Sequence, residues 1–533
     1  MGPVCNSENT SSECQYIDAG QGTHRLCHFT FRTTAHEMTP QQLHQMFEQD
    51  FVETRDEKPQ SIEDRMFLKM MSEEIHQKED GHYEMPLPLK GDVRLPNNRA
   101  AAVQRLKGLR SKLVRNDAFR RDYTTFMEAT IANGHAEKVP TDEQQLSDGR
   151  VWYLPHHGIY HPKKPDKIRV VFDCSAEFGG EVLNSHLLQG PDMTNSLSGI
   201  LCRFRMKPIA LTCDIRGMFN QLGVNRSDRN FLRFLWWKNG DVYQEPEEYR
   251  MTTHLFGARS SPACAMFALR TTADTYEDES GKEAADFVRR NFYIDDGLTS
   301  VDDEDTAVRL IDTTRQLCKQ GGFELHKLSS NSVEVLKSVP PESRCSTTQS
   351  LEVGVGRLPI QRALGIEWDT ENDVLQFSVK PNEKAPTRRG MLSVVSSIFD
   401  PLGFISPFIL RGKQILKELC RDGLGWDDPV PETLLMRWNE WMSELETLST
   451  LKIRRCYTPR DFGTLQQVEL HHFSDASTHG YGQCSYLRLI DDQNRVCCRL
   501  VMSKARVTPS KPVTVPRLEL TAALISVQIS SFL

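Results

Sequence analysis

The sequence contains, between residues 291 and 298, the stretch Asn291-Phe292-Tyr293-Ile294-Asp295-Asp296-Gly297-Leu298. This aromatic-rich run ends in two adjacent carboxylates and a glycine, a pattern that predicts a β-hairpin with acid at its tip. Neighbouring carboxylates repel each other unless cations lie between them, so a buried tip of this kind indicates a bound divalent metal. The alternative is a solvated hairpin turn, since Asp-Gly commonly connects two strands.

Another carboxylate lies upstream, where Asp214 ends the apolar strand predicted over Ile209–Asp214. Together with Asp295 and Asp296 it supplies three carboxylates that can converge on one point. Two Mg²⁺ ions held there would lower the barrier for in-line phosphoryl transfer, one activating a 3′-hydroxyl and the other neutralising a triphosphate. Mn²⁺ would be a substitute for Mg²⁺ at such a site.

The composition narrows the class of protein. The chain has 533 residues, enough for several domains with cores of their own. Its 14 cysteines are scattered without a Cys-x-x-Cys pair, which argues against a zinc ribbon or a disulfide framework and for a reducing compartment. The sequence has no long apolar run and no signal-peptide core, so we expect neither a membrane span nor secretion.

The charge is unevenly distributed. A net charge of −7 does not by itself indicate a nucleic-acid-binding protein, but basic residues cluster between Arg105 and Arg121 and again between Lys163 and Arg169. Local basic stripes set the affinity for phosphates. The alternative for each cluster is an ordinary solvated helix face or loop.

Strands and helices are mixed along the chain, which predicts the α+β class. The periodicity predicts two helices over Thr39–His76, broken at Lys58-Pro59, and one long helix over Arg99–Gly134. Further predictions are strands at Val151–Pro155, Ile168–Asp173 and Phe231–Trp237, helices at Pro262–Tyr276 and Glu304–Gly321, a hairpin around Ala363–Trp368, and helices over Met391–Cys420 and Leu434–Leu448. In the last helix, Trp438 and Trp441 are expected to pack in a core, with base stacking as the alternative.

The order of these motifs resembles that of a retroelement reverse transcriptase. The matching features are the basic hairpin, the strand to Asp214, the turn Gly257–Pro262, the hairpin Tyr293–Asp296, and the stretches Gly322–Lys327 and Leu364-Gly365. A closer resemblance is to the Pol polyprotein of BEL/Pao long-terminal-repeat retrotransposons. It is carried by Val171–Ala176, Leu183-Asn184, Asp214–Phe219 and above all Ser397–Phe404 leading to Gly425–Asp427, and it covers roughly residues 40–533.

The resemblance implies a right-hand polymerase with fingers, a palm with an antiparallel sheet, and a thumb, followed by a partial RNase H-like α/β domain. The expected divisions are a disordered leader at 1–38, a helical linker from an upstream protease region at 39–98, fingers and palm at 99–380, a Pao-type thumb or connection at 381–465, and a truncated RNase H-like domain at 466–533.

The resemblance also implies roles for individual residues. Asp214, Asp295 and Asp296 would be metal ligands, with Asp214 and Asp295 the direct bridges, and Lys327 would be a general acid for the pyrophosphate leaving group or a surface lysine. The nucleotide would contact Lys167, Arg169, Phe219, Phe256 and Gly257, with Phe219 blocking a ribose 2′-hydroxyl. Phe256 departs from many retroviral relatives, which have Gln at this position. Tyr293, Gly365 and Ile366 would lie against the primer end.

The C-terminal stretch resembles the first three strands and the first helix of an RNase H domain. Asp475 and Glu519 match two of the four metal carboxylates of that family. We therefore expect vestigial residues without hydrolytic activity, and an exposed, sticky sheet edge.

Together these features predict an RNA-directed DNA polymerase of a retrotransposon, with an RNA template, a DNA or RNA primer, dNTPs and other Pol and Gag products as partners. A DNA-templated polymerase is a minor variant. The alternative from another class is a catalytically idle, nucleic-acid-binding remnant of a Pol polyprotein. The expected location is the cytoplasm, in a retroelement particle, or the nucleus.

Overall fold

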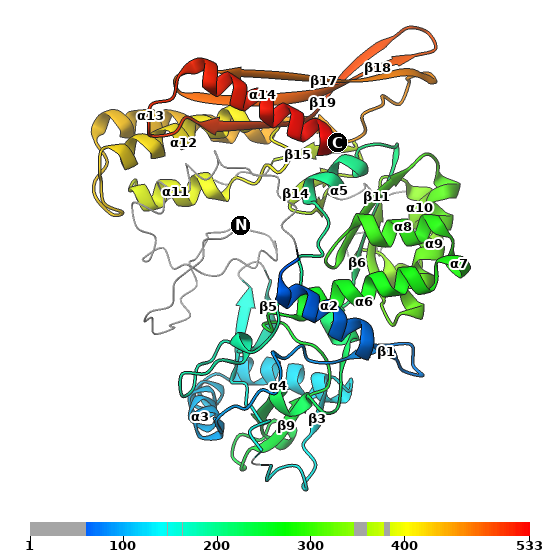
Figure 1. The fold of residues 1–533 in the computed structure, drawn as a ribbon, viewed down its shortest axis with the longest axis vertical. Coiled ribbons are helices and arrows are strands. Elements are labelled where there is room, and N and C mark those ends of the chain that lie inside the picture. The colour runs from blue at the N-terminus through cyan, green and yellow to red at the C-terminus, as the bar shows by residue number, and fades with distance from the viewer. Residues whose placement is uncertain (1–59, 147, 162–163, 346–359, 378–383, 533) are drawn as a thin grey trace.

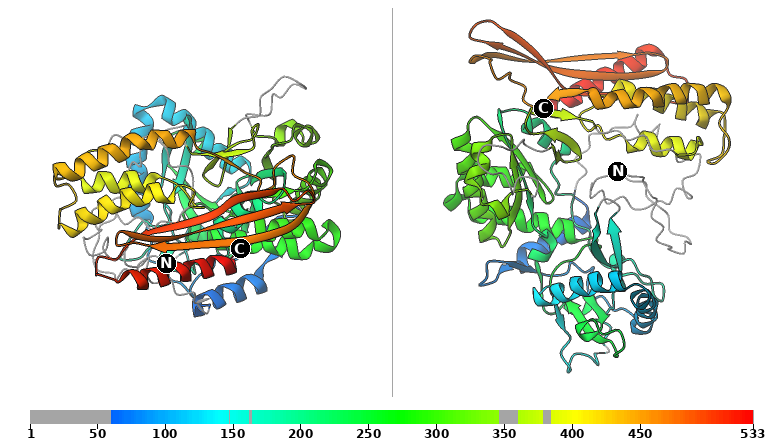
Figure 2. Two further views of the ribbon diagram at one scale, coloured as in Figure 1. Left: turned by 90° about the horizontal axis from the view of Figure 1, so that it is seen from above. Right: turned by 180° about the vertical axis from the view of Figure 1, so that it is seen from behind.

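The computed structural model describes residues 60–146, 148–161, 164–345, 360–377 and 384–532. The chain forms a mixed α/β fold whose elements gather into three groups along the longest axis (Figures 1 and 2). The predicted leader at 1–38 and the first of the two helices predicted over Thr39–His76 lie outside the described residues. Among the described residues, no helix is long and apolar enough to cross a membrane, and every cysteine is a free thiol.

The N-terminal lobe, at the bottom of Figure 1, begins with two helices where the sequence predicted one. Helix α3 spans Arg99–Arg115 and helix α4 spans Asp117–Ala132. Asn116 between them has an extended backbone, and its side-chain oxygen accepts a hydrogen bond from Phe119 N at 2.9 Å. This N-cap stops one helix and starts the next, so the prediction of a continuous helix was wrong.

The apolar stripe of α3 faces inward as predicted. Leu106, Leu109 and Leu113 are buried, while the basic residues Arg105 and Lys112 on the same helix are exposed. The Lys112 ammonium lies 4.3 Å from the centroid of the Phe119 ring, which holds part of this basic surface against α4.

The basic hairpin lies one segment later than predicted. Strand β4 spans His156–His161 and strand β5 spans Lys164–Phe172, paired from His156 opposite Phe172. The segment Val151–Pro155, predicted as a strand, makes only an isolated bridge. Its consecutive residues Trp152, Tyr153 and Leu154 are all buried, whereas in a strand with one solvated face buried and exposed side chains would alternate. Most of the basic segment predicted as a loop is therefore strand.

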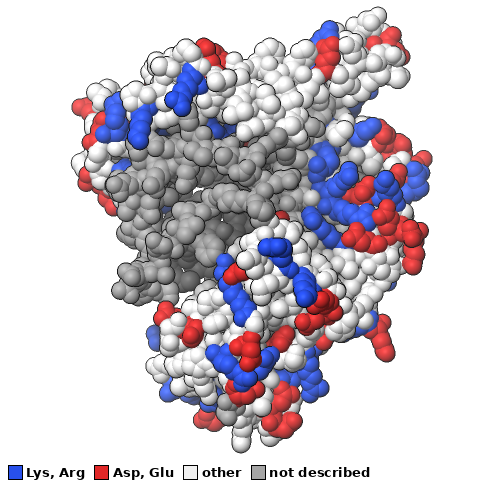
Figure 3. Space-filling model, in the orientation of Figure 1, with Lys and Arg blue, Asp and Glu red and all other residues white. Residues whose placement is uncertain are grey.

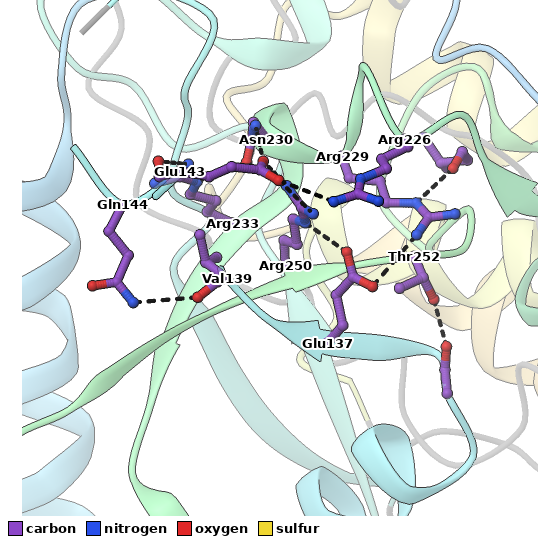
Figure 4. A network of polar contacts seen from close by, with 12 residues as sticks. Glu137, Val139, Glu143, Gln144, Arg226, Arg229, Asn230, Arg233, Arg250 and Thr252 are labelled. Carbon is purple, nitrogen blue, oxygen red and sulfur yellow. Dashed lines mark hydrogen bonds and ion pairs between the residues drawn. The ribbon is translucent and has the colours of Figure 1, made fainter. Parts of the chain in front are cut away.

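A network of buried charges braces the small sheet of this lobe, whose order is β3-β9-β8. The strands are Ala136–Lys138, Glu247–Met251 and Arg233–Trp236. The Arg250 guanidinium donates to Glu137 Oε1 at 2.7 Å and also bonds Glu143 (Figure 4). Arg233 pairs with Glu248 at 3.1 Å. Each buried guanidinium thus has a carboxylate partner, without which its burial would be costly.

The central lobe is built on an antiparallel sheet with the order β10-β11-β6-β12. Its strands are Phe292–Tyr293, Asp296–Val301, Ile209–Ile215 and Leu325–Ser330. Leu211, Cys213 and Ile215 of β6 face a core shared with helices α2 (Ile62–Glu74), α6 (Ser261–Thr275), α8 (Lys282–Asn291) and α9 (Glu304–Gln320). Basic and acidic side chains are interspersed on the outer surface over α7 (Glu277–Ser280), α8 and α9 (Figure 3).

The opposite face of the same sheet packs on a different core. Ala210 and Leu298 point to this side, against helix α5 (Leu197–Phe204) and Trp368. Because side chains alternate along a strand, Asp214 belongs to the Ala210 side and not to the helix side. A second antiparallel sheet follows, with the order β13-β14-β15-β16. Its strands are Ile360–Ala363, Ile366–Asp369, Val374–Gln376 and Lys452–Arg454.

Three helices and a final sheet complete the chain. Helices α11 (Arg388–Ser397), α12 (Ser406–Arg421) and α13 (Glu432–Leu445) share a core in which Trp438 and Trp441 are buried, as predicted. The sheet β17-β18-β19 carries helix α14 (Val515–Phe532) and lies across the top of Figure 1. Its strands are Leu465–Ala476, Gly480–Asp491 and Val496–Val507.

Two buried arginines link the central lobe to the C-terminal part of the chain. Arg205, after α5, donates to the carbonyl oxygens of Leu500 and Val501 in β19 at 3.0 and 3.1 Å, and its guanidinium lies over the Tyr457 ring. Arg455 forms a buried ion pair with Asp373 at 2.6 Å. Arg205 thereby anchors the C-terminal sheet to the end of α5, whereas Arg455 holds the second sheet against the segment Lys207-Pro208.

The stretch Ser397–Phe404, which carried most of the resemblance, is the connection between α11 and α12. Asp400 accepts hydrogen bonds from Phe404 N and Ile405 N, and burial raises its pKa to about 6. Gly403 has a φ of +74°, and a Cβ there would lie 1.9 Å from Ser503 O in β19. Only glycine allows this close approach of the connection to the C-terminal sheet.

The ion pair at Glu143 gives a pH-dependent contribution to stability. The hydrogen bond from Arg250 lowers the pKa of Glu143 to about 2. Because the pKa is lower in the folded chain, the pair stabilises the fold above the ordinary glutamate pKa, and this contribution is lost as the pH falls through that value toward 2. We expect Glu143→Gln to lower the free energy of unfolding at neutral pH by about 1–2 kcal/mol, and the deficit to shrink under acid conditions.

Urea unfolding of the parent and the variant at neutral and acid pH measures this difference. Glu440→Gln, an exposed position on α13, is the control and should change little. A deficit that is the same at both pH values would contradict the assignment.

Candidate functional site

Three polar residues form a row across the central sheet. Asp296 of β11 and His326 of β12 are the direct cross-strand partners of Asp214 in β6. Directly paired residues of antiparallel strands project to the same face, so the three side chains share one side of the sheet. This is the side away from α6, α8 and α9.

The hairpin predicted from the sequence forms as expected, with Ile294 and Asp295 at its tip between β10 and β11. Ile294 has a φ of +57°, an uncommon conformation for a β-branched residue. The Asp295 carbonyl accepts a hydrogen bond from Ile215 N at 2.8 Å, which fixes the tip beside the end of β6. The register places Asp296, and not Asp295, directly opposite Asp214.

Asp214 has a partner on each carboxylate oxygen. His326 Nε2 lies 2.6 Å from Oδ1, and Lys327 Nζ donates to Oδ2 at 2.6 Å. The Asp214 side chain is only 15% exposed. Burial alone would raise its pKa, but the bonds from His326 and Lys327 outweigh burial and lower the pKa below the usual value. Asp214 is therefore a partly buried, ionised carboxylate with two basic neighbours.

His326 was missed by the sequence analysis. Its position immediately before Lys327 was the available signal, because the stretch ending at Lys327 had already been matched to the family. The pairing of β12 with β6 was not predicted, and that pairing is what brings the imidazole to Asp214.

The residues suit a divalent cation in chemistry but not in placement. Carboxylate oxygens are the ligands that Mg²⁺ prefers, and Asp214, Asp295 and Asp296 lie on adjacent strands or the tip that joins them. Within the described ranges, however, no group of three or more His, Cys, Asp or Glu side chains is placed to hold a metal ion. Both oxygens of Asp214 are instead held by His326 and Lys327.

Two aromatic residues predicted near the nucleotide contact each other. Phe219, in the 3₁₀ turn Met218–Gln221 that follows β6, is buried, and its ring centroid lies 4.6 Å from that of Phe256. Phe256 is 53% exposed and stands just before the turn at Gly257. Phe256 therefore covers Phe219 and presents an apolar surface to solvent.

The turn Gly257–Pro262 is held by Asn184. The Asn184 amide donates to Gly257 O at 3.0 Å, and its oxygen accepts from Arg259 N at 2.9 Å. Gly257 has a φ of +109°, and a Cβ there would lie 2.9 Å from Phe172 O at the end of β5. The glycine thus lets the turn approach the basic hairpin.

The other predicted contacts occupy different surroundings. Lys167 and Arg169 are both exposed on β5. Tyr293 is partly buried between the two cores of the central sheet. Gly365 lies in the turn before β14, but Ile366 is buried in a core, so its side chain is not available to a primer.

The two predicted RNase H carboxylates lie on separate elements. Asp475 is exposed near the end of β17 and Glu519 is exposed on α14. β17 is an edge strand with Val468 and Phe473 55% and 58% exposed, in agreement with the predicted exposed edge.

Comparison with known proteins identifies the class of fold. The chain is similar to the foamy viral protease-reverse transcriptase in complex with dsDNA, with a TM-score of 0.51 and 13% identity over 92% of this chain and 86% of that chain. It also aligns with the same protein in complex with RNA/DNA hybrid (TM-score 0.49, 13% identity) and with the dRH form in complex with ds DNA (TM-score 0.49, 14% identity). These two alignments cover 91% and 78% of this chain, and the chain spans 55% and 60% of their lengths.

Residues 387–533 match the family model described as the Pao retrotransposon-like RNaseH-like domain. Over these residues the match confirms the resemblance to Pao-type retroelements and the RNase H-like character of the C-terminal region. The matched region includes α11–α13 as well as the sheet β17-β18-β19. A search of curated proteins found no match to the chain.

The close approach at Gly257 predicts that alanine costs more stability at this glycine than at another glycine with a positive φ. Gly257→Ala should destabilise the protein by about 2–4 kcal/mol, because strain at positive φ adds to a clash with a backbone carbonyl. Gly281→Ala is the matched control, since Gly281 has a φ of +84° with nothing within 4 Å of its Cβ position. The control should cost about 1 kcal/mol. Thermal unfolding measures both, and equal losses would show that the contact with Phe172 O has no effect.

Proposed function

We propose that the chain is an RNA-directed DNA polymerase that extends a primer on an RNA template with dNTPs. The observation that carries the proposal is the row on the central sheet, where Asp214 and Asp296 are direct partners and Asp295 lies at the adjoining tip. Three carboxylates at the ends of neighbouring strands suit nucleotidyl transfer, because they can hold the divalent cations that neutralise the negative charge of the triphosphate.

In this proposal Asp214, Asp295 and Asp296 are ligands for two Mg²⁺ ions, with Mn²⁺ as a substitute. When bound, the ions would supply the positive charge that the triphosphate requires. Lys167 and Arg169, exposed on β5, would contact phosphates, where a bidentate guanidinium is suited. Lys327 Nζ, already within the site, is the candidate proton donor to the leaving group.

The second candidate function is a nucleic-acid-binding remnant that does not catalyse. One observation favours it: Asp214 is occupied by two basic side chains, and the described carboxylates do not surround a common point. The two functions differ in chemistry and not in binding, so a single substitution can separate them.

Mg²⁺-dependent extension of a DNA primer annealed to RNA tests the proposal. We expect the parent chain to incorporate dNTPs and Asp295→Asn to lose at least about a hundredfold in rate, because a metal ligand is removed, while affinity for the hybrid is retained. Asp312→Asn, an exposed carboxylate on α9, is the control and should retain activity. If neither the parent nor the variant extends the primer although both bind the hybrid, the remnant is the correct description.

Phe219 gives a separate prediction about sugar selection. If its ring blocks a ribose 2′-hydroxyl, Phe219→Ala should raise the efficiency of ribonucleotide incorporation relative to deoxynucleotides by about tenfold or more. Phe473→Ala, which removes an exposed ring on β17, is the control and should leave the ratio unchanged. Single-nucleotide incorporation kinetics measure the ratio. An unchanged ratio in Phe219→Ala would remove this role.

A further inference from the structure

His326 and Lys327 are consecutive residues that bond the same carboxylate through different oxygens. We propose that they act on cation binding in opposite senses: His326 is a positioning residue that aims Asp214, whereas Lys327 is a displaceable internal cation that a divalent ion must replace. The inference rests on the proposed function, because it concerns the same carboxylates.

His326 is fixed in place by the sheet. It is the direct partner of Asp214, and the neighbouring pair Leu325 and Ile215 continues the register. The imidazole is 17% exposed and reaches Oδ1 at 2.6 Å from a short side chain. To donate to a carboxylate, Nε2 must carry the proton. The short side chain and the strand pairing on both sides of it hold the imidazole beside Asp214.

Lys327 is held much less firmly. Its φ is +53°, and the register of β12 against β6 shifts between His326 and Ser329, so Lys327 lies in an irregularity of the strand. Its side chain is 45% exposed and has several rotatable bonds. A solvated ammonium on a flexible stem makes a weak ion pair and can leave at small cost.

The two carboxylate oxygens of Asp214 therefore differ in how easily a divalent cation can bind them. A divalent cation needs at least one of them, and the oxygen held by the exposed group, Oδ2, is the easier to free. Lys327 and the incoming cation carry like charges, so the ammonium must move away when the ion binds. His326 retains its bond to Oδ1 and keeps the carboxylate in a single orientation.

This arrangement explains why the described carboxylates do not surround a common point. Asp214 is aimed at its two basic neighbours on the β12 side, although Asp296 is its partner on the β11 side. Until a divalent ion binds, the internal cation supplies part of the charge neutralisation that Asp214 requires.

The test is direct binding of Mn²⁺ to the full chain without nucleotide or primer, measured by electron paramagnetic resonance. We expect Lys327→Met to bind about 2- to 5-fold more tightly than the parent, because a competing ion pair is lost. His326→Phe, which keeps a ring but no donor, should bind about tenfold more weakly, in the range found when an outer partner of a metal ligand is removed. His326→Gln, which keeps an N–H, should restore most of the affinity.

Lys337→Met is the control for removal of a surface lysine, since Lys337 pairs with Glu334 on α10 (Val333–Ser338) away from the row. It should match the parent. Circular dichroism on every variant establishes that the fold is kept. Weaker or unchanged binding in Lys327→Met would overturn the displaceable cation, and unchanged binding in His326→Phe would overturn the positioning role.

Asp214→Asn separates this inference from the proposed function. If the parent binds Mn²⁺ and Asp214→Asn does not, the carboxylate site exists and the comparison of the His326 and Lys327 variants decides the inference. If Asp214→Asn binds as tightly as the parent, the metal assignment itself fails, and both proposals fall with it.

Discussion

The antiparallel pairing of β6 with both of its neighbours is the constraint on which the site depends. It sets Asp296 and His326 on either side of Asp214, and strand alternation turns all three away from the helices that form the core behind them. A slip of one residue on either strand would send a charged group into that apolar core. The packing of Leu211, Cys213 and Ile215 therefore maintains the site without touching it.

Two of the six non-glycine residues with positive φ in the described part of the chain flank this row. Ile294 at the hairpin tip and Lys327 in β12 both have positive φ, as does Leu364 in the turn before β14. Such conformations cost energy and persist only where the surrounding structure enforces them. Here the hydrogen bond from Ile215 N to Asp295 O stabilises the hairpin tip next to Ile294, and the bond from Lys327 Nζ to Asp214 stabilises the conformation of Lys327.

Local signals allowed much of the fold to be predicted. The hairpin at Asp295-Asp296, the strand ending near Asp214 and the helix that begins near Pro262 are each fixed by short-range chemistry. The break at Asn116 was missed because a side-chain cap interrupts an otherwise continuous helical pattern. The contact between His326 and Asp214 spans 112 residues and depends on a register that no local pattern encodes. Roles that involve a nucleotide or a primer stay predictions.

The buried position of Arg205 has a consequence for how the chain can be divided. Its guanidinium donates to the carbonyl oxygens of Leu500 and Val501 in β19, and also to those of Arg454 and Arg455 at the end of the second sheet. Cutting the chain before β17 would remove the two acceptors in β19 and leave one side of a buried guanidinium without the carbonyl oxygens that it binds. The predicted start of the RNase H-like domain is therefore not a point at which the chain can be divided without loss of stability. Exchange of this domain by recombination would have required another residue in place of Arg205.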